Sequence, residues 1–270
     1  MIVLAPTTDT HSHIIAYHQN YIMPVYYTES PDQRAYINNT PDNQHISHLD
    51  TKYQLSFEVP ILTIGNDNAG GNDAGQNHAV EYATLYMTYT QVSYWQNWNH
   101  GSWFFRENNY EPVLMVGTPL DRLDDKWQWN VGYVHQSNGR GGSDERTWNR
   151  LFVEGGMHTD RWSLNVRLWD VLRDESFIQH NPGLVRYFGY GRWIASYHLH
   201  KNTLSLLSRN NLTSGFSRGL WQLTWSFPMS THVIGMRGFI QYLYGYGQSL
   251  IEYDHRSNAV GIGVSFSDFK

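Results

Sequence analysis

Hydrophobic and polar residues alternate along many stretches of the chain. In residues 127–133, Trp, Val and Tyr alternate with Gln, Asn and Gly, and in residues 162–168, Trp, Leu and Val alternate with Ser163, Asn165 and Arg167. A period of two places successive side chains on opposite faces of a β-strand. Each of these stretches therefore predicts a strand with one apolar face and one mainly polar face.

The alternating segments predict about twelve strands. They lie near residues 54–61, 80–95, 110–117, 127–137, 146–157, 161–171, 184–191, 192–200, 202–209, 217–228, 232–244 and 259–267. Residues 1–50 are rich in His, Asn, Asp, Thr and Pro and show little periodicity. We therefore expect residues 1–50 to form a periplasmic segment that precedes a barrel formed by residues 51–270.

Polar groups on the inner faces of the strands indicate a closed barrel in a membrane. Arg167, Arg237 and Gln241 are expected to face inward, where a lumen can pair them more easily than the dry core of a soluble aromatic β-sandwich, the alternative fold. The chain has 11 Trp and 19 Tyr but a mean hydropathy of -0.53. No segment approaches the ~20 apolar residues of a membrane-spanning helix. The expected fold is all-β, a transmembrane antiparallel β-barrel of about twelve strands in a bacterial outer membrane.

Charge and cysteine content exclude several classes of function. The net charge is -5, and the 19 Lys and Arg residues are spread along the chain without a basic patch. Such a distribution gives no electrostatic footprint for nucleic acid, so no nucleic-acid partner is expected. The absence of Cys excludes a disulfide framework and thiolate metal sites.

The hairpin around residues 133–151 carries candidate catalytic residues on its apolar face. His135 and Ser137 continue the apolar parity of their strand, and Asn149 shares parity with the apolar residues after it. Ser137 is a candidate nucleophile, His135 its base and Asn149 the group that orients the base. Gly139 would offer a backbone N–H to an oxyanion, or it is simply a turn glycine. Because the face is apolar, these residues predict a serine hydrolase that acts on lipid.

Two longer motifs resemble the outer-membrane phospholipase A family. His135-Gln-Ser-Asn-Gly-Arg140 with Trp148-Asn-Arg-Leu151 resembles its active-site hairpin, and Phe105-Arg-Glu-Asn-Asn-Tyr-Glu-Pro112 resembles a second family segment. Residues 89–91, 95–96 and 20–24 are also similar to the family. The resemblance implies a twelve-stranded barrel whose outer-surface triad hydrolyses acyl esters of phospholipids and lysophospholipids. It also implies activation by calcium and by homodimer formation.

The resemblance implies a calcium site made of oxygen ligands from both subunits. Arg140 would give its carbonyl, and Ser102 matches a family hydroxyl that comes from the partner subunit. A second serine ligand of the family aligns with Glu145 in this chain. Glu145 is therefore the expected calcium ligand, and Ser143 is the alternative.

The resemblance also assigns roles to two residues near the hairpin. Gln91 matches a polar residue at the family's dimer interface, although an inward or headgroup-level glutamine is the alternative. Tyr110 matches a substrate-contacting residue, and an aromatic-girdle position is an equal interpretation.

Two other functions fit a barrel of this kind. If the hairpin residues were only interfacial, the chain would be a passive outer-membrane channel or scaffold. The same triad chemistry would also suit a lipopolysaccharide deacylase.

Overall fold

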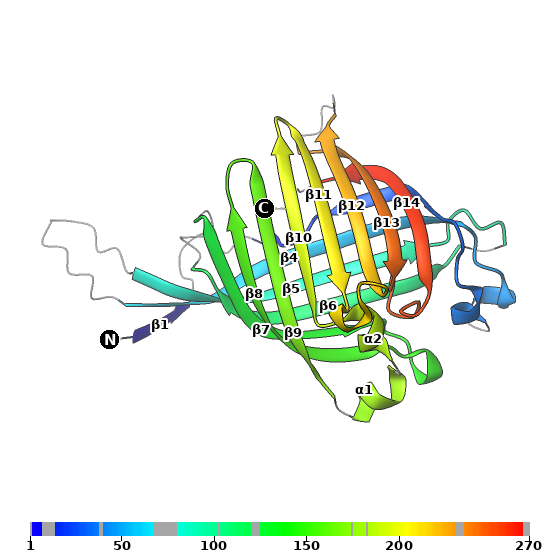
Figure 1. Cartoon of the computed structure of the whole chain (residues 1–270), viewed down its shortest axis with the longest axis horizontal. Coiled ribbons are helices and arrows are strands. Elements are labelled where there is room, and N and C mark those ends of the chain that lie inside the picture. The colour runs from blue at the N-terminus through cyan, green and yellow to red at the C-terminus, as the bar shows by residue number, and fades with distance from the viewer. Residues whose placement is uncertain are drawn as a thin grey trace, which may run out of the picture.

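Twelve antiparallel strands close into a β-barrel (Figure 1). The computed structural model describes residues 2–6, 14–37, 40–66, 80–101, 103–119, 125–173, 175–181, 183–229 and 235–266. The barrel strands are β3 (Tyr21–Thr28), β4 (Leu49–Asn66), β5 (Val80–Trp95), β6 (Phe105–Gly117), β7 (Trp127–Ser137), β8 (Thr147–His158), β9 (Trp162–Leu172), β10 (Gly191–Leu199), β11 (Asn202–Asn210), β12 (Gly219–Pro228), β13 (Arg237–Tyr246) and β14 (Arg256–Ser265). Each strand pairs with its sequence neighbours, and the pairing of β14 with β3 closes the cylinder. The predicted fold class is confirmed.

Two further strands continue the sheet along the edge of β4. They are β1 (Ile2–Pro6), which pairs with residues 62–66, and β2 (Ile15–Ala16), which pairs with residues 57–58. In Figure 1, β1 and the far ends of β4 and β5 extend beyond the rim of the barrel.

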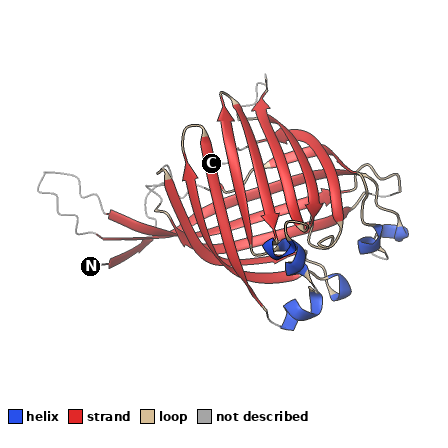
Figure 2. Ribbon diagram, viewed as in Figure 1, coloured by secondary structure: helices blue, strands red, loops and turns tan. Residues whose placement is uncertain are grey.

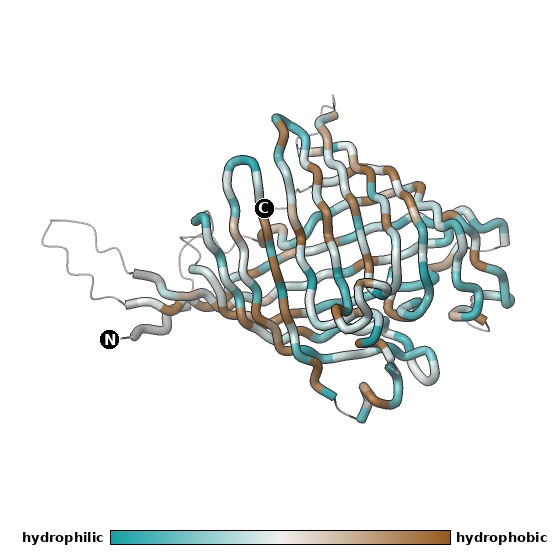
Figure 3. The backbone as a smooth tube through the Cα atoms, in the orientation of Figure 1, coloured by the Kyte–Doolittle hydropathy of each residue, from teal (hydrophilic) through white to brown (hydrophobic). Residues whose placement is uncertain are grey.

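The alternating sequence pattern separates an apolar outer surface from a polar lumen. On β9, Trp162 is 56% exposed and Leu168 is 56% exposed, whereas Arg167 between them is 2% exposed. Figure 3 shows the same alternation of hydrophobic and hydrophilic residues along the other strands. An outward apolar band over a polar interior is the arrangement that a lipid bilayer requires of a barrel.

The helical turns within the described residues lie in the connections at one end of the barrel (Figure 2). They are η1 (Gln33–Tyr36), η2 (Pro41–Asn43), η4 (Gly142–Asp144), α1 (Glu175–His180), α2 (Leu184–Phe188) and η5 (Leu212–Ser214). At the opposite end, β8–β9 and β10–β11 are joined by only residues 159–161 and 200–201. Outer-membrane barrels place long loops outside the cell and short turns in the periplasm, so the helical end is the extracellular end.

None of the described helices has the length and hydrophobicity needed to cross a membrane.

The expected boundary at residue 50 is wrong, because β3 is a barrel strand within the segment expected to precede the barrel. A register shift between Met23 and Tyr26 leaves Pro24 and Val25 together on the outer surface. This irregularity breaks the alternation within the strand. The sequence pattern therefore does not reveal β3.

The strand expected at residues 184–191 is also wrong, because residues 184–188 form α2. Leu184 and Phe188 lie one helical turn apart and pack into the buried cluster that contains Trp148 and Trp169. Gly183 and Gly189 flank the helix with φ of 85° and 70°, values that favour glycine. The expected count of about twelve strands still agrees with the structure, since one missed strand offsets one false strand.

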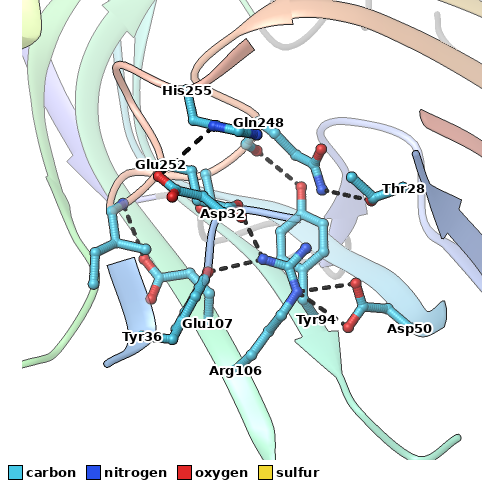
Figure 4. A network of polar contacts seen from close by, with 12 residues as sticks. Thr28, Asp32, Tyr36, Asp50, Tyr94, Arg106, Glu107, Gln248, Glu252 and His255 are labelled. Atoms are coloured by element: carbon cyan, nitrogen blue, oxygen red, sulfur yellow. Dashed lines mark hydrogen bonds and ion pairs between the residues drawn. The ribbon is translucent and has the colours of Figure 1, made fainter. Parts of the chain in front are cut away.

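A buried ion-pair network joins strands and loops at the extracellular mouth of the barrel (Figure 4). The Arg106 Nε donates to both carboxylate oxygens of Asp50, at 3.1 and 2.9 Å, and its Nη1 donates to Glu252 Oε2 at 2.9 Å and to the Tyr36 hydroxyl at 2.8 Å. Glu252 belongs to the β13–β14 loop, residues 247–255. Arg106 therefore joins β4, β6, η1 and this loop across the barrel mouth.

A β-bulge makes this network possible. Tyr94 pairs with Glu107 but Trp95 pairs with Phe105, so Arg106 is the extra residue of β6. The bulge turns both Arg106 and Glu107 inward, where each is 1% exposed. Two consecutive charged residues thus face the lumen despite the alternation of the strand.

Replacing Arg106 with Met should lower the free energy of unfolding by about 3–5 kcal/mol, because two buried carboxylates lose their shared partner. Denaturant unfolding in detergent micelles, followed by tryptophan fluorescence, measures the change. The exposed Arg256 provides a matched control, since Arg256→Met should change stability by less than about 0.5 kcal/mol. An Arg106→Met protein as stable as the wild type would contradict the structural role of the network.

Candidate active site

His135 and Asn149 meet on the outer surface of the β7–β8 hairpin. They are direct cross-strand partners, and His135 Nδ1 lies 2.8 Å from Asn149 Oδ1. Because an amide oxygen only accepts, Nδ1 carries the proton and the lone pair is on Nε2. The imidazole is therefore oriented as a base directed away from Asn149.

Ser137 follows His135 by two residues and lies on the same face of β7. It ends the strand and pairs with Tyr110 on β6 and with Thr147 on β8. Same-face neighbours on a strand have Cα atoms roughly 7 Å apart, a spacing that an imidazole and a hydroxyl can bridge. The hairpin therefore places the expected nucleophile beside the expected base.

Tyr133 is a further member of this group that the sequence pattern did not single out. Its hydroxyl donates to Asn149 Oδ1 at 2.7 Å, so the amide oxygen accepts from both Tyr133 and His135. Tyr133 shares the outward parity of His135, and this parity is the only sequence signal for it. A second donor on the same oxygen fixes the orientation of the Asn149 amide.

The loop after Ser137 requires glycine at residue 139. Gly139 has φ of 66°, and a Cβ there would lie 2.8 Å from Cε2 of the Tyr110 ring. A larger residue would be strained by the backbone and would clash with the ring. Tyr110 thus packs against the backbone whose N–H is the expected oxyanion donor.

Asn138 organises the loop between Ser137 and Thr147. The side chain is 4% exposed, and its Oδ1 accepts from the backbone N–H of Arg146 at 2.9 Å and of Arg140 at 3.3 Å. Its Nδ2 donates to the Asp144 carbonyl at 2.9 Å. One buried amide therefore replaces several backbone hydrogen bonds that the loop cannot make by itself.

Arg140 connects this loop to the network at the barrel mouth. Its Nε donates to Glu107 Oε2 at 3.0 Å, and its Nη2 donates to the Arg106 carbonyl. The other Glu107 oxygen accepts from Asn109 Nδ2 at 3.0 Å and from the Ile251 N–H at 3.3 Å. The backbone beside Ser137 is therefore held from inside the barrel.

The expected calcium ligands are only partly assembled in one chain. Glu145 Oε2 lies 3.9 Å from His180 Nε2, and the Glu145 side chain is 31% exposed. Ser143 Oγ donates to Asp144 Oδ1 at 3.5 Å. Ser102 lies outside the described residues. Within the described ranges, no three His, Asp or Glu side chains are grouped as a metal site.

Gln91 and Tyr110 lie in one cross-strand row with Ser137. Leu55 pairs with Gln91, Gln91 with Tyr110, and Tyr110 with Ser137. Gln91 Oε1 accepts from the Tyr89 hydroxyl at 3.0 Å, and its Nε2 donates to Ser93 Oγ at 2.9 Å. The row runs from the candidate dimer residue to the candidate nucleophile along the outer surface.

Comparison with known proteins identifies the family of this barrel. The model of the phospholipase A1 family matches residues 5–266. The chain belongs to the phospholipase A1 family. Phospholipase A1 of Proteus vulgaris is 34% identical over 257 residues, which cover 93% of this chain and 81% of the relative.

Solved structures agree with this membership. The outer membrane phospholipase dimer of Salmonella typhi with bound calcium matches with a TM-score of 0.79 and 29% identity, over 97% of this chain and 95% of that chain. Outer membrane phospholipase A from Escherichia coli matches with a TM-score of 0.78 and 30% identity, over 95% of this chain and 99% of that chain. The expected class, a phospholipase barrel of the bacterial outer membrane, is confirmed.

Tyr133→Phe should reduce ester hydrolysis by about 2- to 10-fold, because one hydrogen bond to Asn149 contributes about 0.5–1.5 kcal/mol. Initial rates in detergent micelles measure the loss, and circular dichroism confirms folding. Tyr242→Phe, at another exposed tyrosine of the barrel strands, is the control and should retain full activity. Equal rates of hydrolysis for Tyr133→Phe and the wild type would show that Tyr133 does not contribute to the site.

Proposed function

We propose that the protein is a calcium-dependent phospholipase whose Ser137, His135 and Asn149 hydrolyse phospholipid and lysophospholipid esters at the lipid-facing surface. The hydrogen bond from His135 to Asn149 on the outside of the barrel carries this proposal. A passive channel or scaffold has no need for an oriented imidazole facing lipid. The chemistry accordingly takes place beside the headgroups of the outer leaflet.

The reaction proceeds through an acyl-enzyme. The Ser137 hydroxyl transfers its proton to His135 Nε2 as Oγ attacks the ester carbonyl, and the imidazolium then protonates the departing alcohol. Water repeats the sequence and releases the fatty acid. Asn149 holds the Nδ1 proton in place throughout, and the Gly139 N–H stabilises the oxyanion. In support, one Escherichia coli outer membrane phospholipase A structure is an active-site mutant with an asparagine replaced by alanine.

The residues near Gly139 suit a calcium ion. The Arg140 carbonyl and the Glu145 carboxylate are oxygen donors, which Ca²⁺ prefers, and both belong to the loop that Asn138 organises. Ser102 of the partner subunit would complete the set, and Ser143 is the alternative to Glu145. A bound Ca²⁺ would supply positive charge near the oxyanion. The calcium-bound dimer of the Salmonella typhi relative supports a site shared between subunits.

Dimer formation would place two such surfaces together. Gln91 lies on the outer face of β5 and already bonds to Tyr89 and Ser93 within its own chain. An amide in an apolar environment gains from a partner across a membrane interface, so the Gln91 side chains of two subunits would bond to each other. Tyr110, between Gln91 and Ser137, would then contact the acyl chain of the substrate.

Ser137→Ala should reduce fatty-acid release from phospholipid micelles by about 10³-fold or more, because the acyl-enzyme no longer forms. A chelator should abolish release by the wild type, and added calcium should restore it. Ser217→Ala, in an exposed loop, is the control. Calcium-independent release, or release that survives Ser137→Ala, would refute the mechanism. Release from lipopolysaccharide alone would favour a deacylase.

Glu145→Gln should raise the calcium concentration for half-maximal activity by about 10-fold or more, because the loop loses its anionic ligand. Ser143→Ala should leave that concentration unchanged. Calcium titration of fatty-acid release by both variants measures the effect. The opposite result would make Ser143 the ligand and exclude Glu145.

A further inference from the structure

Three arginines form a row across the inner wall of the barrel. Arg167 on β9 pairs directly with Arg192 on β10, and Arg192 pairs directly with Arg209 on β11. All three line the same cavity in the lumen. Like charges directly opposite on neighbouring strands repel each other, and an enclosed lumen screens this repulsion poorly.

Acidic side chains compensate only part of this charge. Glu154 Oε2 lies 2.6 Å from Arg167 Nε and 3.7 Å from Arg192 Nη2. Arg150, which lines the same cavity, pairs with Glu111 at 2.9 Å. Four arginines and the two carboxylates that pair with them leave an excess of two positive charges.

Arg209 has no carboxylate partner among the described residues. Its Nη2 donates to the carbonyls of Tyr246 at 3.3 Å and Gly247 at 2.8 Å, and its guanidinium lies 3.6 Å from the centre of the Phe188 ring. These contacts hold the side chain in place without neutralising it. A fixed, uncompensated guanidinium inside a barrel is costly unless an anion accompanies it.

The cavity beside these groups is large enough for a small anion. It has a volume of about 170 Å³, and its walls include Arg150, Arg167, Arg192, Arg209, Glu111 and Gln248. Within the part of the chain that the structure describes, the Nε groups of Arg150, Arg192 and Arg209 are buried and have no hydrogen-bond acceptor. Buried donors without acceptors, on side chains that carry an excess charge, are suited to an anionic ligand.

We propose that this cavity binds a phosphate group between Arg150, Arg192 and Arg209. Guanidinium forks suit tetrahedral oxyanions, because they donate two parallel hydrogen bonds to two oxygens. A phosphate dianion would also offset the excess positive charge of these arginines, beside which Lys52 lines the same cavity. Either inorganic phosphate or glycerophosphate, the polar product of complete phospholipid deacylation, carries this group.

Phosphate titration of the whole protein in a non-ionic, phosphate-free detergent tests the site. Sodium phosphate replaces sodium chloride at constant ionic strength, and Tm is followed by tryptophan fluorescence. Saturating phosphate should raise the Tm of the wild type by roughly 5 °C or more, since a ligand bound only to the folded state stabilises it. Equilibrium dialysis with radiolabelled phosphate should give about one site per chain. Separate arms with glycerophosphate and with sulfate identify the source and the selectivity.

The Arg209→Gln variant distinguishes a specific phosphate site from general effects of salt on stability. In chloride alone this variant should melt no lower than the wild type, because it relieves repulsion along the row, and its phosphate response should disappear. Arg161→Gln, at an exposed turn, should respond to phosphate as the wild type does. Arg192→Gln provides a second variant, expected to weaken phosphate binding at least 10-fold, should Arg209→Gln fold poorly.

A rise in Tm that Arg209→Gln abolishes, with either phosphate or glycerophosphate, supports the site. The compound that produces this rise is then the source of the bound phosphate group. Wild-type protein that binds neither phosphate nor glycerophosphate in dialysis overturns the proposal. An equal rise of Tm in wild type and Arg209→Gln would also overturn it, because it would reflect salt exclusion from the protein surface.

Discussion

The closed ladder between β3 and β14 is the constraint from which the rest of the structure follows. In a lipid bilayer each backbone N–H and C=O needs a partner within the protein, so an open edge is not tolerated. The pairing of Val260 with Tyr27 and of Ala259 with Thr28 removes the last free edge. Because apolar and polar side chains alternate along each strand of the closed barrel, the barrel has an apolar outer surface and a polar inner surface. The position of a residue in this alternation decides whether it meets lipid or the lumen.

The candidate site uses both surfaces, although its reactive groups face only lipid. His135, Ser137 and Asn149 project outward, while Arg140 reaches inward to Glu107 at 3.0 Å. The bulge at Arg106 brings Glu107 to the mouth network, and the loop of residues 247–255 holds it there through the Ile251 N–H. The backbone that carries the expected oxyanion donor is therefore positioned by contacts inside the barrel. A mobile surface loop alone would not hold such a donor rigidly enough for catalysis.

The sequence predicts the surfaces well and the individual partners poorly. Parity placed His135 and Asn149 on one face, and hairpin register then made them cross-strand neighbours. The sequence pattern does not predict β3, because the register shift at Pro24 interrupts its alternation. A short apolar segment does not distinguish period two from period 3.6, so the sequence predicts a strand where the structure has α2. Tyr133 was not recognised for a similar reason: parity gives the face of a residue, but its hydroxyl contact with Asn149 depends on three-dimensional geometry.

Charge is distributed unequally between the two surfaces, and this distribution gives a physical reason for a neutral residue beside the proposed base. The lumen contains paired arginines and glutamates, whereas on the outside the Asn149 amide oxygen accepts from the His135 imidazole and from the Tyr133 hydroxyl. A carboxylate at the position of Asn149 would be an ion facing lipid and would require a cationic partner there. An amide oxygen fixes the imidazole without that cost, and Tyr133 holds the amide in turn. In the proposed mechanism these three side chains are neutral at rest, and a charge develops on His135 when it accepts the proton of Ser137.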